Sequence, residues 1–516
     1  MREFGLAIAV VLAIAGMSQA TQYTWDGGAL DNNSWNNPVN WSSDTKPVSG
    51  DTAVFSTTPS LPTRNVFLDA DQTIDNLTQT AGRAHINTKR VSADPLYTLT
   101  INSGDITQAS ASGRLVLNCP IYLGDNVAIW KHMNTGYAIQ FWDAGISYPG
   151  PLSSVNQTVP NTSILLSGPN QNWDATSNCV DFAGRPINIT GNLEIRSGNV
   201  AGLGTAAAVT YGVILGDTSG TLNACVEDLG GGTNTIWANI TVRPGSSGTK
   251  RIGLVNRNNA SVATWKGNIL LNDNVTVSNS LGTHATQIQR QVFTGVISGA
   301  KGVTKDGTGV TWFYGKNTYL GRTLVNAGTL VIDNTTSGQG DYVVASTATL
   351  AGFGTIGLAD TKKVEIADGG ILSPGDMGNL KPPTSAVGTL TIDGDLLLHS
   401  LANLAFDIGE STTPGTTYDT IVLQSNLTLD GTLVVTPQIV LDNAPRTYTL
   451  IDYGSGTLTD LGLDVTGIPG GIPYSLVTGG GKVQLITGVI PEPATLLLLG
   501  TGAVGLIGYF RRRRMS

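Results

Sequence analysis

Few residues of this 516-residue sequence have the type and spacing that catalysis requires. Its four histidines have no spacing relation to one another: His85, His132, His284 and His399. The sequence contains neither a Gly-x-Ser-x-Gly nucleophile elbow nor a His-Glu-x-x-His zinc motif. Asp181 and Arg185 near Trp173 could be imagined on a polysaccharide-cleaving face, but solvated loop residues explain them equally well. We therefore predict no catalytic residue, no metal site and no cofactor.

Three tryptophans are better placed for ligand binding than any charged group. Aromatic rings stack on the faces of pyranose sugars, and the candidates for this role are Trp130, Trp142 and Trp173. The same large rings could instead cap the fold or fill the corners of its core. Glycan binding and packing both stay open for these residues.

The composition excludes several classes of protein. Charged residues make up 13% of the chain, about half of the roughly 25% of ordinary soluble proteins. This rules out a charge-rich helical bundle or coiled coil. The net charge is −8, and five of the 29 basic residues lie in the two terminal segments, so nucleic acid is not an expected partner. The widely spaced Cys119, Cys179 and Cys225 form no metal pattern, and we expect them to be buried.

The first 20 residues have the layout of a secretory signal peptide. Arg2 precedes an apolar run over residues 4–16, and Ser18 and Ala20 supply the small residues of a cleavage site. We expect cleavage after Ala20, with the Sec translocon and signal peptidase as partners. The alternative is an N-terminal membrane anchor that is not removed.

The C-terminus combines three features in a fixed order. Pro491-Glu492-Pro493 precedes an uncharged apolar stretch over residues 494–510, and a basic cluster follows, formed by Arg511, Arg512, Arg513 and Arg514. As a helix, the apolar stretch would be about 26 Å long, which is close to the thickness of a hydrocarbon core. The arginines should remain in the cytoplasm and stop transfer. The order predicts one transmembrane helix with the body of the protein outside.

This tail, residues 489–516, resembles the PEP-CTERM sorting signal of exported Gram-negative bacterial proteins. The resemblance implies recognition by an exosortase-type membrane transpeptidase, with cleavage near Pro491-Glu492-Pro493. It implies an inner-membrane intermediate, followed by release or attachment at the cell surface, and an association with exopolysaccharide. The alternative is a plain tail anchor that is never cut.

Between the two ends, the chain is predicted to be all-β. Short runs alternate apolar residues with Thr or Val and end at Asx-Gly turns, as in Leu99–Gly104, Leu390–Gly394 and Leu427–Gly431. The word Gly-Thr-Leu recurs at irregular intervals, beginning at Gly328, Gly388, Gly431 and Gly456. Irregular recurrence of one strand pattern favours an elongated parallel β-helix, because its rungs align in space while its loops vary in length.

One part of the body resembles a known repeat. Lys305–Trp312 is followed by Asn317-Thr318-Tyr319 and then by Thr323–Leu330. These words look like the autotransporter-associated β-strand repeat, which implies successive rungs of a passenger β-helix. The predicted domains are the signal peptide (1–20), an N-terminal β-helix with a Trp-rich cap (21–300), the repeat region (301–488) and the sorting signal (489–516).

These observations predict a structural or adhesive protein of the cell surface or extracellular matrix, and not an enzyme. The alternative is a surface protein that binds or cleaves polysaccharide on the same scaffold.

Overall fold

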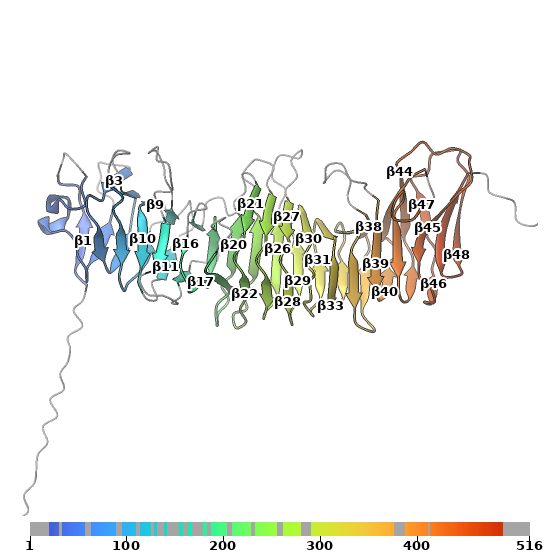
Figure 1. Cartoon of the computed structure of the whole chain (residues 1–516), viewed down its shortest axis with the longest axis horizontal. Helices are drawn as coiled ribbons and strands as arrows, with labels where there is room; N and C mark the ends of the chain where they lie inside the picture. Colours follow the sequence, from blue (N-terminus) through green and yellow to red (C-terminus); the bar gives the residue numbers. More distant parts are fainter. Residues whose placement is uncertain are drawn as a thin grey trace, which may run out of the picture. The chain divides into compact units, whose positions relative to one another are not determined.

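The structure, a computed structural model, describes residues 20–29, 33–56, 63–88, 95–109, 114–124, 128–131, 139–141, 154–157, 164–167, 179–182, 187–203, 209–228, 233–254, 262–279, 290–375, 387–410 and 413–488. This described part contains β-strands and two short 3-10 helices, η1 (Pro38–Asn40) and η2 (Ser42–Asp44), and no α-helix (Figure 1). The prediction of an all-β body is confirmed. The chain divides into two compact units.

The first unit comprises residues 1–168 and 185–191 and contains three parallel sheets. The first sheet has the order β1 (Gln22–Trp25), β2 (Thr52–Phe55), β5 (Asn76–Gln79), β8 (Ile106–Gln108), β11 (Ala128–Lys131) and β14 (Ile164–Ser167). The second has β3 (Thr63–Phe67), β6 (Arg83–Asn87), β9 (Arg114–Asn118) and β12 (Ile139–Phe141). The third has β4 (Gln72–Ile74), β7 (Leu99–Ile101), β10 (Pro120–Leu123), β13 (Ser154–Gln157) and β16 (Ile187–Asn188). The chain visits the three sheets in turn, which is the winding of a parallel β-helix.

The second unit comprises residues 169–184 and 192–516. Its first sheet has the order β17 (Asn192–Ile195), β19 (Gly212–Leu215), β22 (Ile240–Val242), β25 (Ile269–Leu271) and β28 (Ile297–Gly299). Its second has β15 (Cys179–Asp181), β18 (Gly198–Ala201), β20 (Ala224–Asp228), β23 (Lys250–Leu254), β26 (Val275–Asn279), β29 (Val303–Asp306), β31 (Thr323–Val325), β34 (Tyr342–Val344), β37 (Lys363–Ile366), β40 (Asp395–Leu398), β43 (Leu427–Leu429) and β46 (Leu458–Asp460).

The third sheet of this unit has β21 (Thr233–Ile236), β24 (Val262–Trp265), β27 (Arg290–Phe293), β30 (Val310–Phe313), β32 (Thr329–Ile332), β35 (Thr349–Gly352), β38 (Ile371–Pro374), β41 (Asn403–Ile408), β44 (Thr432–Pro437) and β47 (Asp464–Thr466). The fourth has β33 (Thr335–Gln339), β36 (Thr355–Leu358), β39 (Thr389–Asp393), β42 (Thr420–Leu423), β45 (Arg446–Asp452), β49 (Lys482–Thr487) and β48 (Tyr474–Gly479). Up to β28, each turn of the β-helix contributes one strand to the first sheet. From β33 onward, the corresponding strand of each turn belongs to the fourth sheet.

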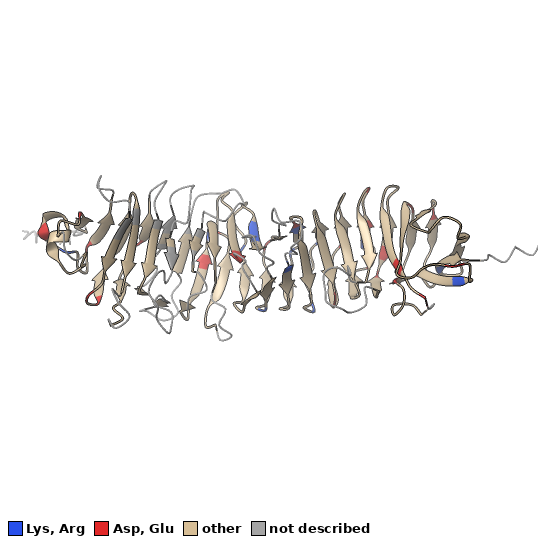
Figure 2. Cartoon of the chain, turned by 90° about the horizontal axis from the view of Figure 1, so that it is seen from above, with Lys and Arg blue, Asp and Glu red and all other residues tan. Residues whose placement is uncertain are grey.

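Alternation along each strand places apolar side chains inside the β-helix. In β39, Leu390 and Ile392 are fully buried, while Thr391 between them is only half-buried. Leu390 pairs in register with Ile421 of the next rung, so the inward side chains stack in columns. The outward positions carry few charges, and most of the ribbon in Figure 2 is neither acidic nor basic. Because short polar residues cover these faces, a chain with 13% charged residues can still close an apolar core.

The recurring turn glycines serve two purposes, of which only one was predicted. Gly431 has a φ of +91°, the left-handed conformation expected of a turn glycine. Gly456 is required for lack of space, since a Cβ atom there would lie 2.0 Å from the carbonyl oxygen of Ser425. The first purpose turns the chain and the second lets neighbouring rungs approach closely.

The N-terminal rungs of the first unit are closed by an aromatic cluster. Trp25, Trp35 and Trp41 are almost fully buried, with ring centroids of Trp35 and Trp41 4.8 Å apart and those of Trp25 and Trp41 5.1 Å apart. Phe55 of β2 packs 5.8 Å from Trp41. The tryptophans at this end therefore fill the core.

Candidate functional site

Of the three tryptophans predicted to stack on glycans, the structure describes only the backbone of Trp130. Trp130 lies on β11, where its backbone pairs with Thr107 of β8 and Ser167 of β14. Its side chain, like Trp142 and Trp173, lies outside the described residues. The glycan platform therefore stays a prediction. Asp181 lies on β15 and pairs with Ala201, while its imagined partner Arg185 lies outside the described residues.

The sorting residues also fall largely outside the described part of the chain. Ser18, Pro491, Glu492, Pro493 and Arg511, Arg512, Arg513 and Arg514 belong to the undescribed ends. Ala20 is described and half-buried, and Thr21 after it accepts a hydrogen bond from the backbone N–H of Thr52 at 2.8 Å. Within the described residues, no helix is long and apolar enough to cross a membrane; the predicted span, 494–510, lies beyond them.

The last residues that the structure describes are held firmly in the fold, and the predicted sorting signal begins directly after them in the sequence. β49 is paired on both edges, with β45 and with β48, and both pairings are antiparallel. Thr487 at its end is fully buried, and the N–H of Gly488 donates to the carbonyl oxygen of Pro473 at 2.9 Å. Gly488 has a φ of +89°, and a Cβ atom there would lie 2.2 Å from the carbonyl oxygen of Ala444. The body is therefore held in place up to residue 488.

Inside the β-helix, one cation replaces an apolar residue. Lys305 of β29 stands in the interior column between Val277 and Val325, and its side chain is fully buried. Its Nζ atom donates to three carbonyl oxygens: Asp306 at 2.9 Å, Gly307 at 2.6 Å and Ala327 at 2.9 Å. Burial lowers the pKa of the Lys305 ammonium to about 7, against a smaller opposing effect of the Asp306 charge. This lysine holds a turn and the following rung together.

A second buried ionic group lies on the outer face of the second sheet. Glu227 of β20 and Arg251 of β23 are 3.4 Å apart, and both are almost fully buried. The thiol of Cys225 donates to Glu227 Oε1 at 3.2 Å. Burial raises the pKa of Glu227, while the Arg251 charge acts in the opposite direction. Buried Cys119 and Cys225 confirm the expectation for those two cysteines; the side chain of Cys179 is not described.

A third buried ionisable group is the carboxylate of Asp419. Both carboxylate oxygens of Asp419 accept backbone hydrogen bonds, from Gly388 at 2.8 Å and from Asp407 at 2.7 Å. Burial raises the pKa of Asp419 to about 8, and the two N–H donors lower it only in part. The residue ties the start of β39 to β41.

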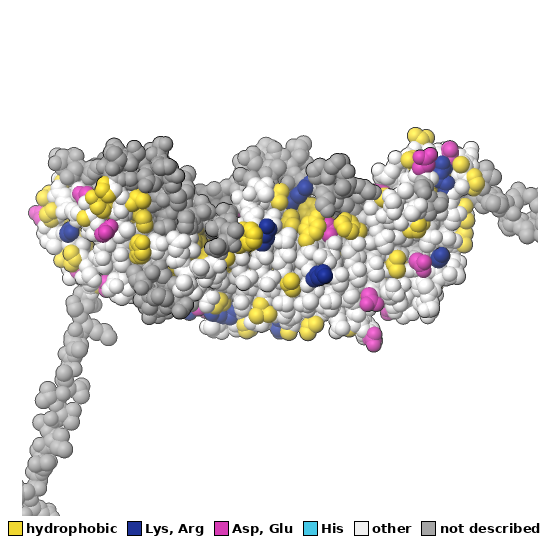
Figure 3. Space-filling model, viewed as in Figure 1, with side chains coloured by type: hydrophobic (Ala, Val, Ile, Leu, Met, Phe, Trp, Pro, Cys, Tyr) yellow, Lys and Arg dark blue, Asp and Glu magenta, His cyan; other side chains and the backbone are white. Residues whose placement is uncertain are grey.

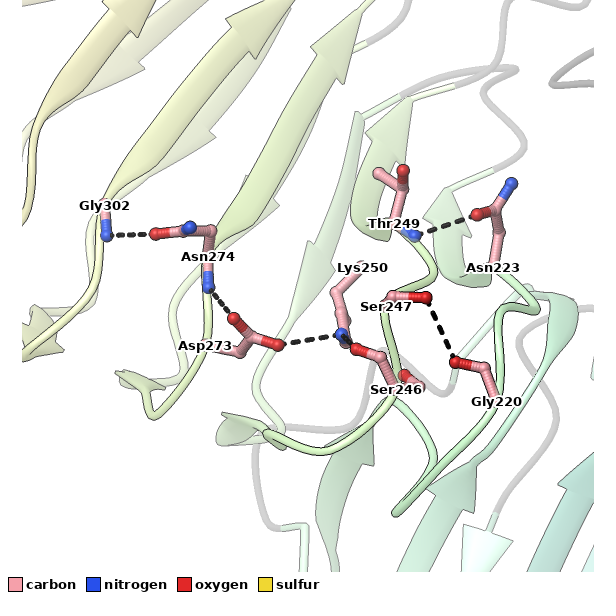
Figure 4. A network of polar contacts seen from close by, with 9 residues as sticks. All are labelled: Gly220, Asn223, Ser246, Ser247, Thr249, Lys250, Asp273, Asn274 and Gly302. Atoms are coloured by element: carbon pink, nitrogen blue, oxygen red, sulfur yellow. Dashed lines mark hydrogen bonds and ion pairs between the residues drawn. The ribbon is translucent and has the colours of Figure 1, made fainter.

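Side chains at the turns connect successive rungs. Asp273 and Lys250 form an ion pair at 2.8 Å, and Lys250 also donates to the carbonyl oxygen of Ser246 (Figure 4). Asp273 accepts from its neighbour Asn274, whose side-chain oxygen accepts the N–H of Gly302 one rung further on at 2.8 Å. Desolvation opposes the ionisation of Asp273, but hydrogen bonds and nearby cations dominate and lower its pKa.

These groups stabilise the fold, and they do not converge on a reaction centre. In the part of the chain that the structure describes, no three His, Cys, Asp or Glu side chains gather as metal ligands. The sequence did not reveal Lys305, Glu227 or Asp419 as buried groups.

Comparison with known proteins agrees with the chemistry of the C-terminus. Residues 489–514 match the family model described as the PEP-CTERM protein-sorting motif, and the match begins one residue after Gly488. The chain is also 38% identical, over 112 residues, to a protein named Adhesin BmaC autotransporter from Brucella suis biovar 1 (strain 1330). That similarity covers 22% of this chain and 3% of the relative's length. This chain thus carries a PEP-CTERM sorting signal and shares sequence with an autotransporter adhesin, which points to an exported cell-surface protein with autotransporter-like repeats.

Proposed function

We propose that the protein is a structural or adhesive component of the cell surface or extracellular matrix. Its signal peptide directs it through the Sec translocon, signal peptidase cuts after Ala20, and the C-terminal helix holds it briefly in the inner membrane. An exosortase-type membrane transpeptidase then processes the tail. The mature β-helix remains at the surface in association with exopolysaccharide.

The observation that carries this proposal is the position of the sorting motif. The PEP-CTERM match occupies residues 489–514, directly after a β-helix that is folded up to Gly488. A sorting signal that follows a complete fold can be removed without loss of core residues. The named activity of the partial relative, adhesion, supports the surface role.

The faces of the β-helix suit a scaffold better than a catalyst. Some outward positions carry hydroxyl side chains in register on neighbouring rungs: Thr276 pairs with Thr304, and Thr355 pairs with Thr391. Short polar side chains on the outer faces offer weak contacts to a hydrated polymer, and a catalytic centre would need ionisable groups at one place. We therefore propose a non-enzymatic role with exopolysaccharide as the partner.

Processing of the tail is tested in a host that carries an exosortase. We compare the wild-type chain with Glu492→Ala and with deletion of residues 511–514. Mass spectrometry of the surface fraction should show that the wild type has lost its C-terminal peptide, while both variants accumulate uncut in the inner membrane. If the mature wild-type protein still ends at Ser516, the tail is not processed, and the alternative of a permanent tail anchor holds instead.

The surface role is tested on the processed protein. It should co-sediment with exopolysaccharide from the same host and release no reducing sugar from it. Release of reducing ends would replace the scaffold proposal with polysaccharide cleavage. The absence of co-sedimentation would remove exopolysaccharide as the partner.

A further inference from the structure

Positive charge is concentrated in one stretch of the second unit. Residues 243–322 contain ten basic and two acidic side chains, a net charge of +8, while the whole chain has a net charge of −8. The stretch runs from the turn after β22 to the turn before β31. Figure 3 shows basic and hydrophobic side chains together over this part of the second unit. A local excess of cations attracts anions to a molecule that is acidic elsewhere.

One extended segment of this stretch carries two cations on the same side. Residues 316–322 lie beside β28, held by backbone hydrogen bonds from Thr318 to Ile297 at 2.8 Å and from Leu320 to Gly299 at 2.9 Å. Side chains of an extended segment alternate between its two sides. Here buried Asn317 and Tyr319 alternate with four exposed residues, namely Lys316, Thr318, Leu320 and Arg322. The two cations therefore point outward, at the two ends of one row.

The two preceding rungs add a cation at each margin. Lys266 precedes β25 and Lys301 follows β28, and both are exposed. The carbonyl oxygen of Lys301 accepts the N–H of Gly321 at 3.3 Å, which places Lys301 next to Arg322. The Nζ atom of Lys266 lies 4.2 Å from the centre of the Trp237 ring, a contact that holds the ammonium group. We call the surface bounded by Lys266, Lys301, Lys316 and Arg322 the cationic face.

The acidic groups around the cationic face are paired, buried or turned to another sheet. Three are in ion pairs: Asp273 with Lys250 at 2.8 Å, Asp341 with Lys362 at 3.1 Å and Glu194 with Arg243 at 2.9 Å. Both carboxylate oxygens of Asp333 are buried. Asp306 lies on β29 in the second sheet. Lys301 also helps to lower the pKa of Asp273, so it is partly compensated, but the face as a whole keeps an excess of positive charge.

We propose that the cationic face binds an anionic polysaccharide, a polymer whose sugars carry carboxylate groups. The proposal rests on the proposed function and names the charge class of its exopolysaccharide partner. The cations would meet the carboxylates. The outward side chains between the cations are leucine or short and polar, and they would meet the sugar rings and hydroxyls; they are Asn268, Leu270, Asn272, Ser298, Thr318 and Leu320.

The spacing of the cations suits separated charges. Lys316 and Arg322 are six residues apart on an extended segment, which corresponds to about 20 Å, and Lys266 lies two rungs before Lys316, roughly 10 Å along the β-helix. Double-stranded DNA carries one charge per ~1.7 Å, a far higher density. An anionic bilayer would also meet the acidic remainder of the chain and be repelled. A polysaccharide with its charges on separate sugars matches the wide spacing.

Binding is tested on the full-length chain in an uncharged detergent, so that the result does not depend on processing of the tail. The ligand is polygalacturonate, which has a carboxylate on every sugar, and its methyl-esterified form supplies the same backbone without the charges. Lys316→Gln with Arg322→Gln removes two cations from the face. Lys46→Gln with Lys482→Gln is the matched control, because it removes two cations in the first unit and on β49. Lys316→Arg with Arg322→Lys keeps the charges in place.

The wild type should bind polygalacturonate and not the esterified polymer. Loss of the two face cations should weaken binding about tenfold, since each exposed ion pair is worth up to about 1 kcal/mol and tenfold corresponds to 1.4 kcal/mol. The remaining binding should also depend less on salt concentration. The control and the charge-conserving variant should bind within about twofold of the wild type, and all variants should keep its melting temperature.

Two results would overturn the assignment directly: equal binding of the esterified polymer, and equal losses in the face variant and the control. Tighter binding to duplex DNA or to anionic vesicles at the same salt concentration would assign the face to that partner instead. If the face variant still co-sediments fully with host exopolysaccharide, the proposed function stands and the cationic face is not its binding site. If the wild type binds polygalacturonate through this face but does not co-sediment with host exopolysaccharide, the site stands and the proposed partner fails.

Discussion

The Nζ atom of Lys305 lies 2.9 Å from the carbonyl oxygen of Ala327, which precedes the strand of the next rung. This contact links two turns of the β-helix from inside the core. Two further carbonyl oxygens complete the surroundings of the ammonium group, so all three of its N–H donors have acceptors.

The buried lysine should make stability depend on pH. Its folded-state pKa, about 7, lies below the roughly 10.4 of an exposed lysine, so the unfolded chain binds more protons between these values. Stability should therefore rise with pH across this window. We expect the urea midpoint to increase from pH 8 to 9.5 and Lys305→Met to lose this increase. Lys316→Met, at an exposed position, should keep it. Identical slopes in all three proteins would contradict the prediction.

Substitutions that differ only in the face of β39 should differ strongly in effect. Leu390→Asp places a charge at a fully buried position and should cost several kcal/mol of unfolding free energy. Thr391→Ser, at the half-buried outward neighbour, should be nearly neutral. Thermal melting of the two variants measures the difference. Equal melting temperatures would mean that the strand faces are assigned the wrong way round.

The asparagine links between turns should contribute individually. The N–H of Asn268 donates to Asn239 Oδ1 at 2.8 Å, and Asn268 Oδ1 accepts the N–H of Val296 at 2.9 Å. Asn268→Ala removes the acceptor for Val296 and should cost about 1 kcal/mol in chemical unfolding. Asn268→Asp keeps an acceptor oxygen and should cost less. If both variants lose the same amount, the hydrogen bond to Val296 is not the cause.

Asp419 should produce the opposite pH dependence to Lys305. Its folded-state pKa, about 8, lies above the roughly 3.9 of an exposed aspartate, so the folded chain binds more protons between pH 4 and 8. Its contribution to stability should fall as pH rises through that range. Asp419→Asn should remove this decline, whereas Asp393→Asn, at an exposed position, should not. Urea unfolding at pH 5 and pH 8 gives the comparison, and a decline that persists in Asp419→Asn would refute the assignment.

The parts of the fold that follow from local patterns were predictable. Alternation placed Leu390 inside and Thr391 outside, because a strand's side chains point to opposite faces. The tail could be recognised because the order of its motif, apolar stretch and arginines has a physical role at a membrane. Gly431 could be assigned to a turn because it follows Asp430 at the end of a strand pattern.

Other features depend on which rungs become neighbours, and loop lengths hide that information. The interior position of Lys305 follows from its register with Val277, and nothing local distinguishes it from an exposed turn lysine. The buried pair of Glu227 and Arg251 likewise forms between strands 20 or more residues apart. The change from parallel to antiparallel pairing at β49 has no signal in the sequence that we can identify.

The in-register columns make the length of the β-helix adjustable in whole units. Ile269 pairs with Ile297 and Val275 with Val303, so joining Asn268 directly to Ile297 would bring each remaining strand opposite a partner of matching pattern. Such an excision shortens the stack by one strand spacing, about 4.8 Å. It leaves the N-terminal aromatic cluster and the strands that lead to Gly488 unchanged. Gene duplication or loss can thus change the reach of the protein without redesigning its ends.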